Sequence, residues 1–114
     1  MKTGQFRIAT ACTGTVMVAA MLLISVPVKA QDAAGALFKT KCAACHGPDG
    51  KGETTIGKAN KLRDLSSTDV QKQSDADLTG IITNGKGKMP PYGKSLKPEQ
   101  IKDLVSYLRS LAKK

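Results

Sequence analysis

Apolar residues recur at helical spacing in three separate stretches of this chain, and the spacing predicts three amphipathic helices. The stretches run from Asp32 to Ala44, from Asp75 to Thr83 and from Pro98 to Ala112. The third has the clearest pattern, a continuous apolar stripe with members three and four residues apart: Ile101, Leu104, Val105, Leu108 and Leu111. No stretch alternates with the period of a strand, and no internal repeat is present. The pattern therefore predicts an all-α fold.

Residues at the expected ends of these helices agree with the pattern. Asp32 would lie at the positive end of the first helix, where an acidic side chain is stabilising. Ser74 is a suitable N-cap for the second helix, and Gly85 is a suitable stop after it. Pro98 suits the first position of the third helix, where its missing N–H is not needed.

Two loops of different composition separate the helices. Residues 47–60 are rich in glycine and charge, so we expect no regular structure there. Residues 62–72 predict one or two short helical turns. Residues 85–96 contain three glycines, two prolines and one methionine, and they predict a second irregular loop.

The N-terminal segment has the pattern of an export signal. Lys2 and Arg7 precede a run from Ile8 to Val28 that contains no charged residue. Small residues before Gln31 predict cleavage after Ala30, which would leave residues 31–114 as one domain exported to the periplasm. The alternative is an uncleaved membrane anchor, because the uncharged run approaches the ~20 residues of a membrane span.

Residues 31–114 hold 15 of the 18 basic residues and all nine acidic ones, a balance of about +6. They contain two cysteines, one histidine, one methionine, three aromatic residues and no tryptophan. A domain of this size has a marginal apolar core and usually needs a further source of stability. A disulfide between cysteines three positions apart would close too small a loop to help, whereas a large buried cofactor would help.

The segment Cys42-Ala43-Ala44-Cys45-His46 carries the candidate chemistry. Two thiols at this spacing project from nearly one face of a helix, so both reach the vinyl groups of one haem, and the next residue ligates the iron. A thioredoxin-like pair normally follows a strand, which the pattern excludes. A zinc site would need a fourth ligand.

Met89 is the candidate for the second axial iron ligand. It is the only methionine beyond residue 30, and no second histidine exists. Pro90 and Pro91 follow it and restrict the backbone, which would hold the thioether in place. The ordinary alternative is core packing, but this loop offers no apolar helical face. His/Met ligation raises the reduction potential and fills both axial sites, so we expect a one-electron carrier rather than an enzyme.

These residues resemble those of the class I cytochromes c, in particular the compact bacterial type. The resemblance runs from the first helix through Cys-Ala-Ala-Cys-His and Lys-Met-Pro-Pro-Tyr to the last helix. It implies one covalent haem c, with His46 proximal and Met89 distal, and a contact between the first and last helices. Phe38 would meet Leu104 and Tyr107 there, and Gly35 would allow the close crossing.

The chain departs from the family pattern at two points. The family often has a proline whose carbonyl accepts the second N–H of the proximal histidine, and Pro48 is too close to do so. We therefore expect a non-proline carbonyl as acceptor. No tryptophan is present to bind a haem propionate, and Arg63 and Tyr92 are the candidates to replace it.

Lysines gather in sequence near the haem motif and the methionine loop, and they predict acidic redox partners, such as a membrane oxidase, a reductase or a periplasmic dehydrogenase. This lysine group consists of Lys39, Lys41, Lys86, Lys88 and Lys94. Export argues against nucleic-acid binding, and we expect a monomer. Two other functions stay open: a dedicated haem subunit of one enzyme complex, and a haem gas sensor if Met89 does not ligate.

Overall fold

The computed structural model describes residues 28–112. The predicted signal peptide therefore lies almost wholly outside the described residues. The predicted cleavage point after Ala30 falls inside the first helix and stays a prediction. Within residues 28–112, no helix has the length and apolar character that crossing a membrane requires.

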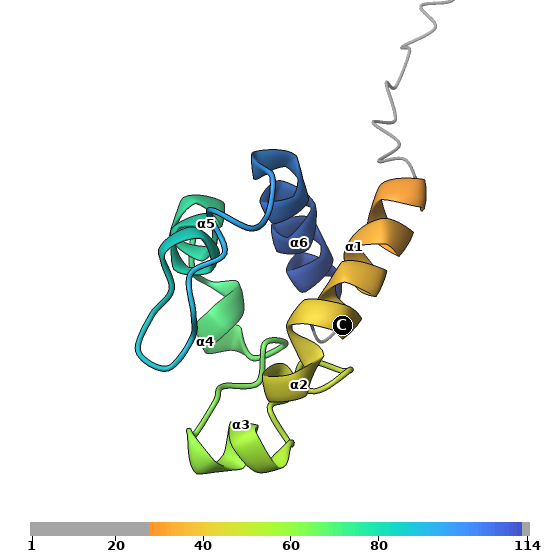
Figure 1. Ribbon diagram of the computed structural model, residues 1–114. Coiled ribbons are helices and arrows are strands. Elements are labelled where there is room, and N and C mark those ends of the chain that lie inside the picture. The colour runs from red at the N-terminus through yellow and green to blue at the C-terminus, as the bar shows by residue number, and fades with distance from the viewer. Residues whose placement is uncertain (1–27, 113–114) are drawn as a thin grey trace, which may run out of the picture.

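Six helices follow one another along the described chain, and no strand lies between them, so the predicted all-α fold is confirmed (Figure 1). They are α1 Val28–Lys41, α2 Ala43–His46, α3 Thr55–Ala59, α4 Thr68–Gln71, α5 Asp75–Asn84 and α6 Pro98–Ser110. Three of them match the predicted helices, and α4 is the short turn expected within residues 62–72.

The predicted ends of α5 and α6 are confirmed. Ser74 Oγ accepts a hydrogen bond from Asp77 N at 3.0 Å, and an Asp77 oxygen accepts one from Ser74 N at 3.4 Å. Gly85 ends α5 with a φ of 74°, which favours glycine. Pro98 opens α6, as the sequence indicates.

Three predictions about the first half of the chain are wrong. The first helix begins at Val28, so Asp32 lies beyond its first turn and does not meet its positive end. The predicted helix 32–44 is also broken at Cys42, where the chain turns from α1 into α2. Residues 47–60 are not wholly irregular, because α3 forms there. Thr54 caps α3 by accepting a hydrogen bond from Gly57 N at 2.8 Å.

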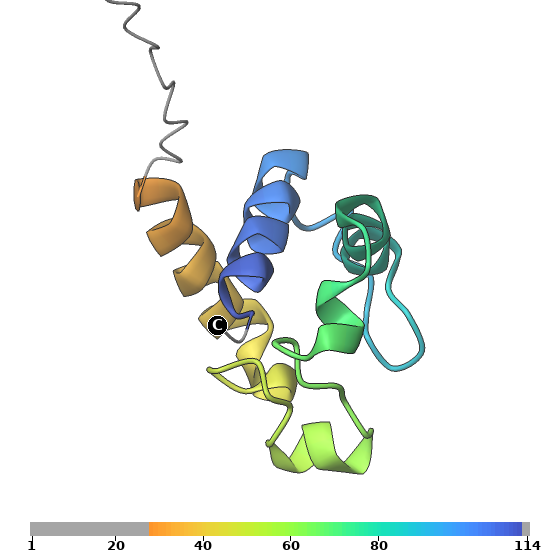
Figure 2. The same cartoon turned by 180° about the vertical axis from the view of Figure 1, so that it is seen from behind.

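The first and last helices cross, as expected, and the two views of the ribbon agree on this (Figures 1 and 2). Phe38 and Tyr107 stack with ring centroids 5.2 Å apart. Phe38 and Leu104 are each only 2% exposed. A β-carbon on Gly35 would lie 3.2 Å from Tyr107, so the absence of a side chain allows this approach.

The last helix is also tied to α4 and α5 by Arg109. Its guanidinium donates to Asp75 Oδ1 at 2.7 Å and to the carbonyl of Gln71 at 2.7 Å. Gln71 in turn donates to the carbonyls of Leu65 and Leu108, at 2.8 and 2.9 Å. Because α6 is fixed to α1 on one side and to α4 and α5 on the other, it sets the distance between α1 and the segment that contains α4 and α5.

The segment between α2 and α4 folds tightly back onto α2. Gly52 N donates to the carbonyl of His46 at 2.7 Å, and Thr54 Oγ1 donates to the carbonyl of Cys45 at 2.7 Å. A β-carbon on Gly57 would lie 2.2 Å from Gly52 O and 2.8 Å from Cys45 O. The end of the Cys-Ala-Ala-Cys-His segment is therefore held by backbone packing that requires glycine at position 57.

We predict that Gly57→Ala lowers the free energy of unfolding of the protein by about 1–3 kcal/mol, because backbone must move to admit the methyl group. Gly80→Ala is the matched control, since a β-carbon there meets nothing within 4 Å. It should raise stability by about 0.4–1 kcal/mol. Guanidinium unfolding followed by circular dichroism measures both. Equal stability of the two variants would contradict the packing described here.

Candidate functional site

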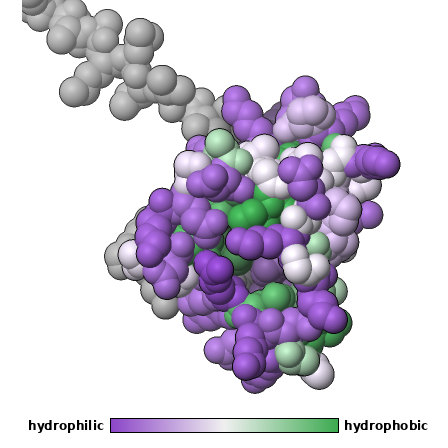
Figure 3. Space-filling model, turned by 90° about the vertical axis from the view of Figure 1, so that its left-hand side faces the viewer, coloured by the Kyte–Doolittle hydropathy of each residue, from purple (hydrophilic) through white to green (hydrophobic). Residues whose placement is uncertain are grey.

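A cavity of about 450 Å³ is lined by residues of α1, α2, α4, α5 and α6 and of the loops between them. Its volume is within the range of sites that hold a cofactor. Its inner wall is apolar and comes from the buried core, with Phe38, Leu78, Ile82 and Leu104 among the lining residues. Figure 3 shows apolar surface in the middle of a mostly hydrophilic face of the molecule.

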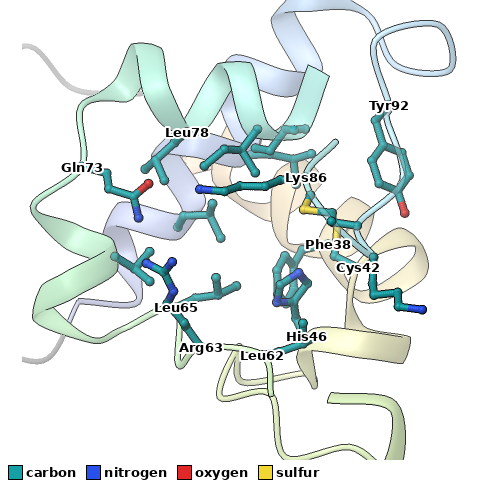
Figure 4. A pocket seen from close by; sticks show the side chains of 18 of the residues that line it. Phe38, Cys42, His46, Leu62, Arg63, Leu65, Gln73, Leu78, Lys86 and Tyr92 are labelled. Carbon is teal, nitrogen blue, oxygen red and sulfur yellow. The ribbon is translucent and has the colours of Figure 1, made fainter. Parts of the chain in front are cut away.

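The Cys-Ala-Ala-Cys-His segment lines one wall of this cavity. The chain stays helical there, because His46 N donates to the carbonyl of Cys42 at 2.9 Å. Cys42 and His46 line the large cavity, and a smaller adjoining cavity of about 50 Å³ is lined by both and by Cys45. Both thiols are free and partly buried. Cys42 and His46 therefore lie on the same side of the large cavity (Figure 4), and Cys45 joins them in the smaller one.

Burial shifts the pKa of two groups on this wall, the Cys42 thiol and the His46 imidazole. Burial raises the pKa of the Cys42 thiol, and the neighbouring Cys45 raises it further. Burial lowers the pKa of His46, so its imidazole is favoured in the neutral form that ligates metals. Burial thus favours a protonated Cys42 thiol and a neutral His46 imidazole.

The ring of His46 differs from the sequence-based expectation. We expected its Nδ1 to donate to a non-proline carbonyl, but Nδ1 is buried and has no hydrogen-bond partner among residues 28–112. Two nearby carbonyls, those of Cys45 and His46, already accept bonds from Thr54 and Gly52. Because Nδ1 is the buried nitrogen, Nε2 is the one that the ring offers to the cavity.

Met89 lines both cavities from the loop 85–96, on a different part of the fold. A two-residue turn presents it: Lys86 N donates to Met89 O at 3.1 Å, and Met89 N donates to Lys86 O at 3.0 Å. Gly87 occupies this turn with a φ of 57°. Gly85 leaves room for the Met89 carbonyl, which would lie 2.6 Å from a β-carbon there. The fold therefore brings Met89 to the cavity that His46 lines.

Polar side chains lie at the other end of the cavity from Cys42. Figure 4 shows Arg63, Gln73 and Lys86 there, from three different segments of the chain. Tyr92 lies at the Cys42 end, and its hydroxyl donates to the carbonyl of Lys41 at 3.1 Å. Of the two residues predicted to replace the family's tryptophan, Arg63 remains placed for that role, and the Tyr92 hydroxyl already has a partner.

The lining residues as a set fit a large flat apolar group that carries acidic substituents at one edge. The walls are apolar, Cys42 stands at one end beside the smaller cavity that Cys45 also lines, and cationic and amide donors stand at the other end. Sequence reasoning missed Gln73, which lies between two helices and has no pattern to mark it. It also missed the apolar lining residues Leu62 and Val70.

Comparison with known proteins gives consistent results. The family model described as "Cytochrome C oxidase, cbb3-type, subunit III" matches residues 29–108. Cytochrome c6 of Rippkaea orientalis is 36% identical over 96 residues, which cover 80% of this chain and 81% of that protein. The cbb3-type cytochrome c oxidase subunit CcoP of Rubrivivax gelatinosus is 42% identical over 72 residues, but these are only 23% of its length.

A solved structure has the same fold. The KustC0563 c-type cytochrome superimposes with a TM-score of 0.65 at 32% sequence identity, covering 70% of this chain and 98% of that chain. The match spans nearly the whole of that smaller protein. The described helices of this chain are therefore arranged as in a complete domain of that kind.

Proposed function

Because the chain belongs to the class I cytochromes c, we propose that it carries single electrons on a haem attached to Cys42 and Cys45 and ligated by His46 and Met89. Covalently bound haem c is the cofactor of this family and of this chain. The assignment of the four residues is the proposal. The observation that carries it is that all four line adjoining cavities, although they come from two distant segments.

Attachment uses the two thiols as they stand in the fold. Cys42 and Cys45 would hold the haem through thioether bonds, and addition of an S–H across a carbon–carbon double bond would need no external oxidant. Free thiols are needed for this, and the structure has no disulfide between Cys42 and Cys45.

The axial ligands define the electron chemistry. Haem iron, when bound, supplies a one-electron couple between its ferric and ferrous forms. His46 offers a neutral ring nitrogen, and Met89 offers a soft thioether that favours the ferrous form. With His46 and Met89 as ligands, the iron would have no open position for oxygen or peroxide, so the protein would transfer electrons without catalysing a reaction of its own.

We predict that the haem-loaded protein keeps its colour through an acid-acetone wash and shows the weak far-red ferric band of a methionine–iron bond. Met89→Ala should lose that band, bind carbon monoxide when reduced, and have a lower reduction potential. Met89→His is the control that restores a sixth ligand: it should exclude carbon monoxide, yet keep a low potential. Axial ligands tune haem potentials over roughly 0.8 V, so redox titration resolves the change. A Met89→Ala protein that retained the band would disprove this ligation.

The electron-exit edge lies where the smaller cavity opens. Lys41, Lys88, Pro90 and Tyr92 line that cavity beside Cys42 and Cys45. Lys41 and Lys88 are both exposed, as are the other members of the lysine group. Positive charge at this edge favours acidic redox partners, such as a membrane oxidase, a reductase or a periplasmic dehydrogenase, and steers their approach.

We predict that oxidation of the reduced protein by the anion ferricyanide slows as ionic strength rises, because salt screens the attraction. Lys88→Gln should slow this reaction about two- to fivefold at low salt. Lys102→Gln is the matched control: Lys102 is exposed on α6 and lines neither cavity. Oxidation by a cationic cobalt complex should respond in the opposite direction. Equal slowing by the two lysine variants would contradict a local docking edge.

A second function is favoured by the match to cbb3-type oxidase subunits, which would make the chain a dedicated haem subunit of a complex. This chain spans about a quarter of the CcoP length, but four fifths of a cytochrome c6. The near-complete overlap with a small cytochrome supports the free carrier, exported to the periplasm by the predicted signal in residues 1–30.

The two functions differ in the size of the native particle. A free carrier should elute from gel filtration of untreated periplasmic extract at the volume of a monomer, with the haem absorbance in a single late peak. A dedicated subunit should elute with its complex and move to the late position only after detergent or high salt. Haem absorbance confined to an early peak in the untreated extract would therefore overturn the free-carrier proposal.

A further inference from the structure

The loop that carries Met89 has few connections to the segment that carries the cysteines and His46. Its described backbone hydrogen bonds to other elements go to α5: Tyr92 N donates to Ile82 O at 2.9 Å, and Gly93 N donates to Thr83 O at 3.0 Å. Among the described residues, the one hydrogen bond from this loop to the α1–α2 segment is made by the Tyr92 hydroxyl.

That hydroxyl donates to the carbonyl of Lys41 at 3.1 Å. Lys41 is the last residue of α1, where helix carbonyls lack partners within the helix, and it directly precedes Cys42. The bond therefore connects the Met89 loop to the end of α1, immediately before Cys42. The Tyr92 side chain is half-buried and lines both cavities, whereas the hydrogen bond itself is exposed to solvent.

The chain between Met89 and Tyr92 is short and stiff. Only Pro90 and Pro91 separate them, and each ring fixes its own φ. Tyr92 is held at its backbone by Ile82 and at its hydroxyl by Lys41, so its position is set from two sides. A displacement of Tyr92 is therefore passed on to Met89 rather than absorbed by the spacer.

We propose that Tyr92 is a positioning residue: its hydrogen bond to Lys41 holds the Met89 loop against the haem face and slows replacement of the methionine by other ligands. This inference rests on the proposed His46/Met89 ligation. Tyr92 does not touch the iron in this scheme. It stabilises the position in which Met89 faces the site and so disfavours replacement of the methionine at equilibrium; no covalent bond holds this loop to the α1–α2 segment.

The expected effect is moderate. A neutral hydrogen bond contributes a factor of about three to ten to a conformational equilibrium. Tyr92→Phe keeps the ring and removes only the hydroxyl. The ferric Tyr92→Phe protein should therefore bind imidazole, which replaces Met89 at the iron, about three- to tenfold more tightly than the unaltered protein does.

The experiment is an imidazole titration of the haem-loaded ferric protein, followed by loss of the far-red methionine–iron band. Tyr107→Phe is the matched control, because Tyr107 stacks on Phe38 through its ring and its hydroxyl has no hydrogen bond among the described residues. Imidazole affinity should be unchanged in this control. Guanidinium unfolding followed by circular dichroism, run on both variants, reports any general loss of stability.

The possible outcomes distinguish failure of the Tyr92 role from failure of the proposed Met89 ligation. An unaltered protein without the far-red band would refute Met89 ligation itself. A band that is present, with the same imidazole affinity in Tyr92→Phe as in the unaltered protein, would overturn the positioning role alone. A similar gain in Tyr107→Phe would also overturn it, because the effect would then be general loosening. Tighter binding in Tyr92→Phe only, with little change in helix unfolding, supports the role.

Discussion

The crossing of α1 and α6 is the contact on which the rest of the structure depends. Gly35 lets the helices approach, and Phe38 stacks on Tyr107 one turn before Cys42. The axis of α1 fixes where the first thiol stands, so this contact places the start of the haem-binding wall. Arg109 then ties the far side of α6 to the chain around α4 and α5. The loop carrying Met89 follows α5 directly. Through its contacts with α1 and with α4 and α5, α6 therefore sets the distance between the Cys42–His46 segment and the Met89 loop.

A core this small explains why the cavity wall and the core are made of the same residues. The most deeply buried side chains, Phe38 and Leu104, belong to the core and also line the cavity. Filling the cavity with an apolar cofactor would remove the partly exposed lining residues Leu62, Leu65 and Ile81 from water, and the gain scales with the apolar area covered. Haem binding and folding are therefore coupled in this chain, as the marginal size of the domain leads one to expect.

Helices with their own start and stop signals were predictable from the sequence, and α5 and α6 follow the expected bounds closely. The Cys-Ala-Ala-Cys-His segment was predictable as a unit because its chemistry depends on spacing alone. The break at Cys42 was not, since nothing local marks it and the crossing with α6 directs it. Nor was α3 predictable in a glycine-rich stretch, where Thr54 and the tight packing at Gly57 stabilise a single turn. The bond between Tyr92 and Lys41 joins residues 51 positions apart and has no sequence signal.

The site has one wall that is secured covalently when haem is attached and one that is held by weaker contacts. On the first wall, the thiols and His46 follow one another along a continuous turn of chain, so their relative positions vary little. On the second, Met89 depends on a two-residue turn, two prolines and the anchoring of Tyr92. Lys86 and Lys88 precede the methionine in the same turn. A partner that binds these lysines therefore contacts the loop that holds Met89. Docking of an acidic partner and retention of the methionine ligand thus involve the same few residues, and each is expected to influence the other through this turn.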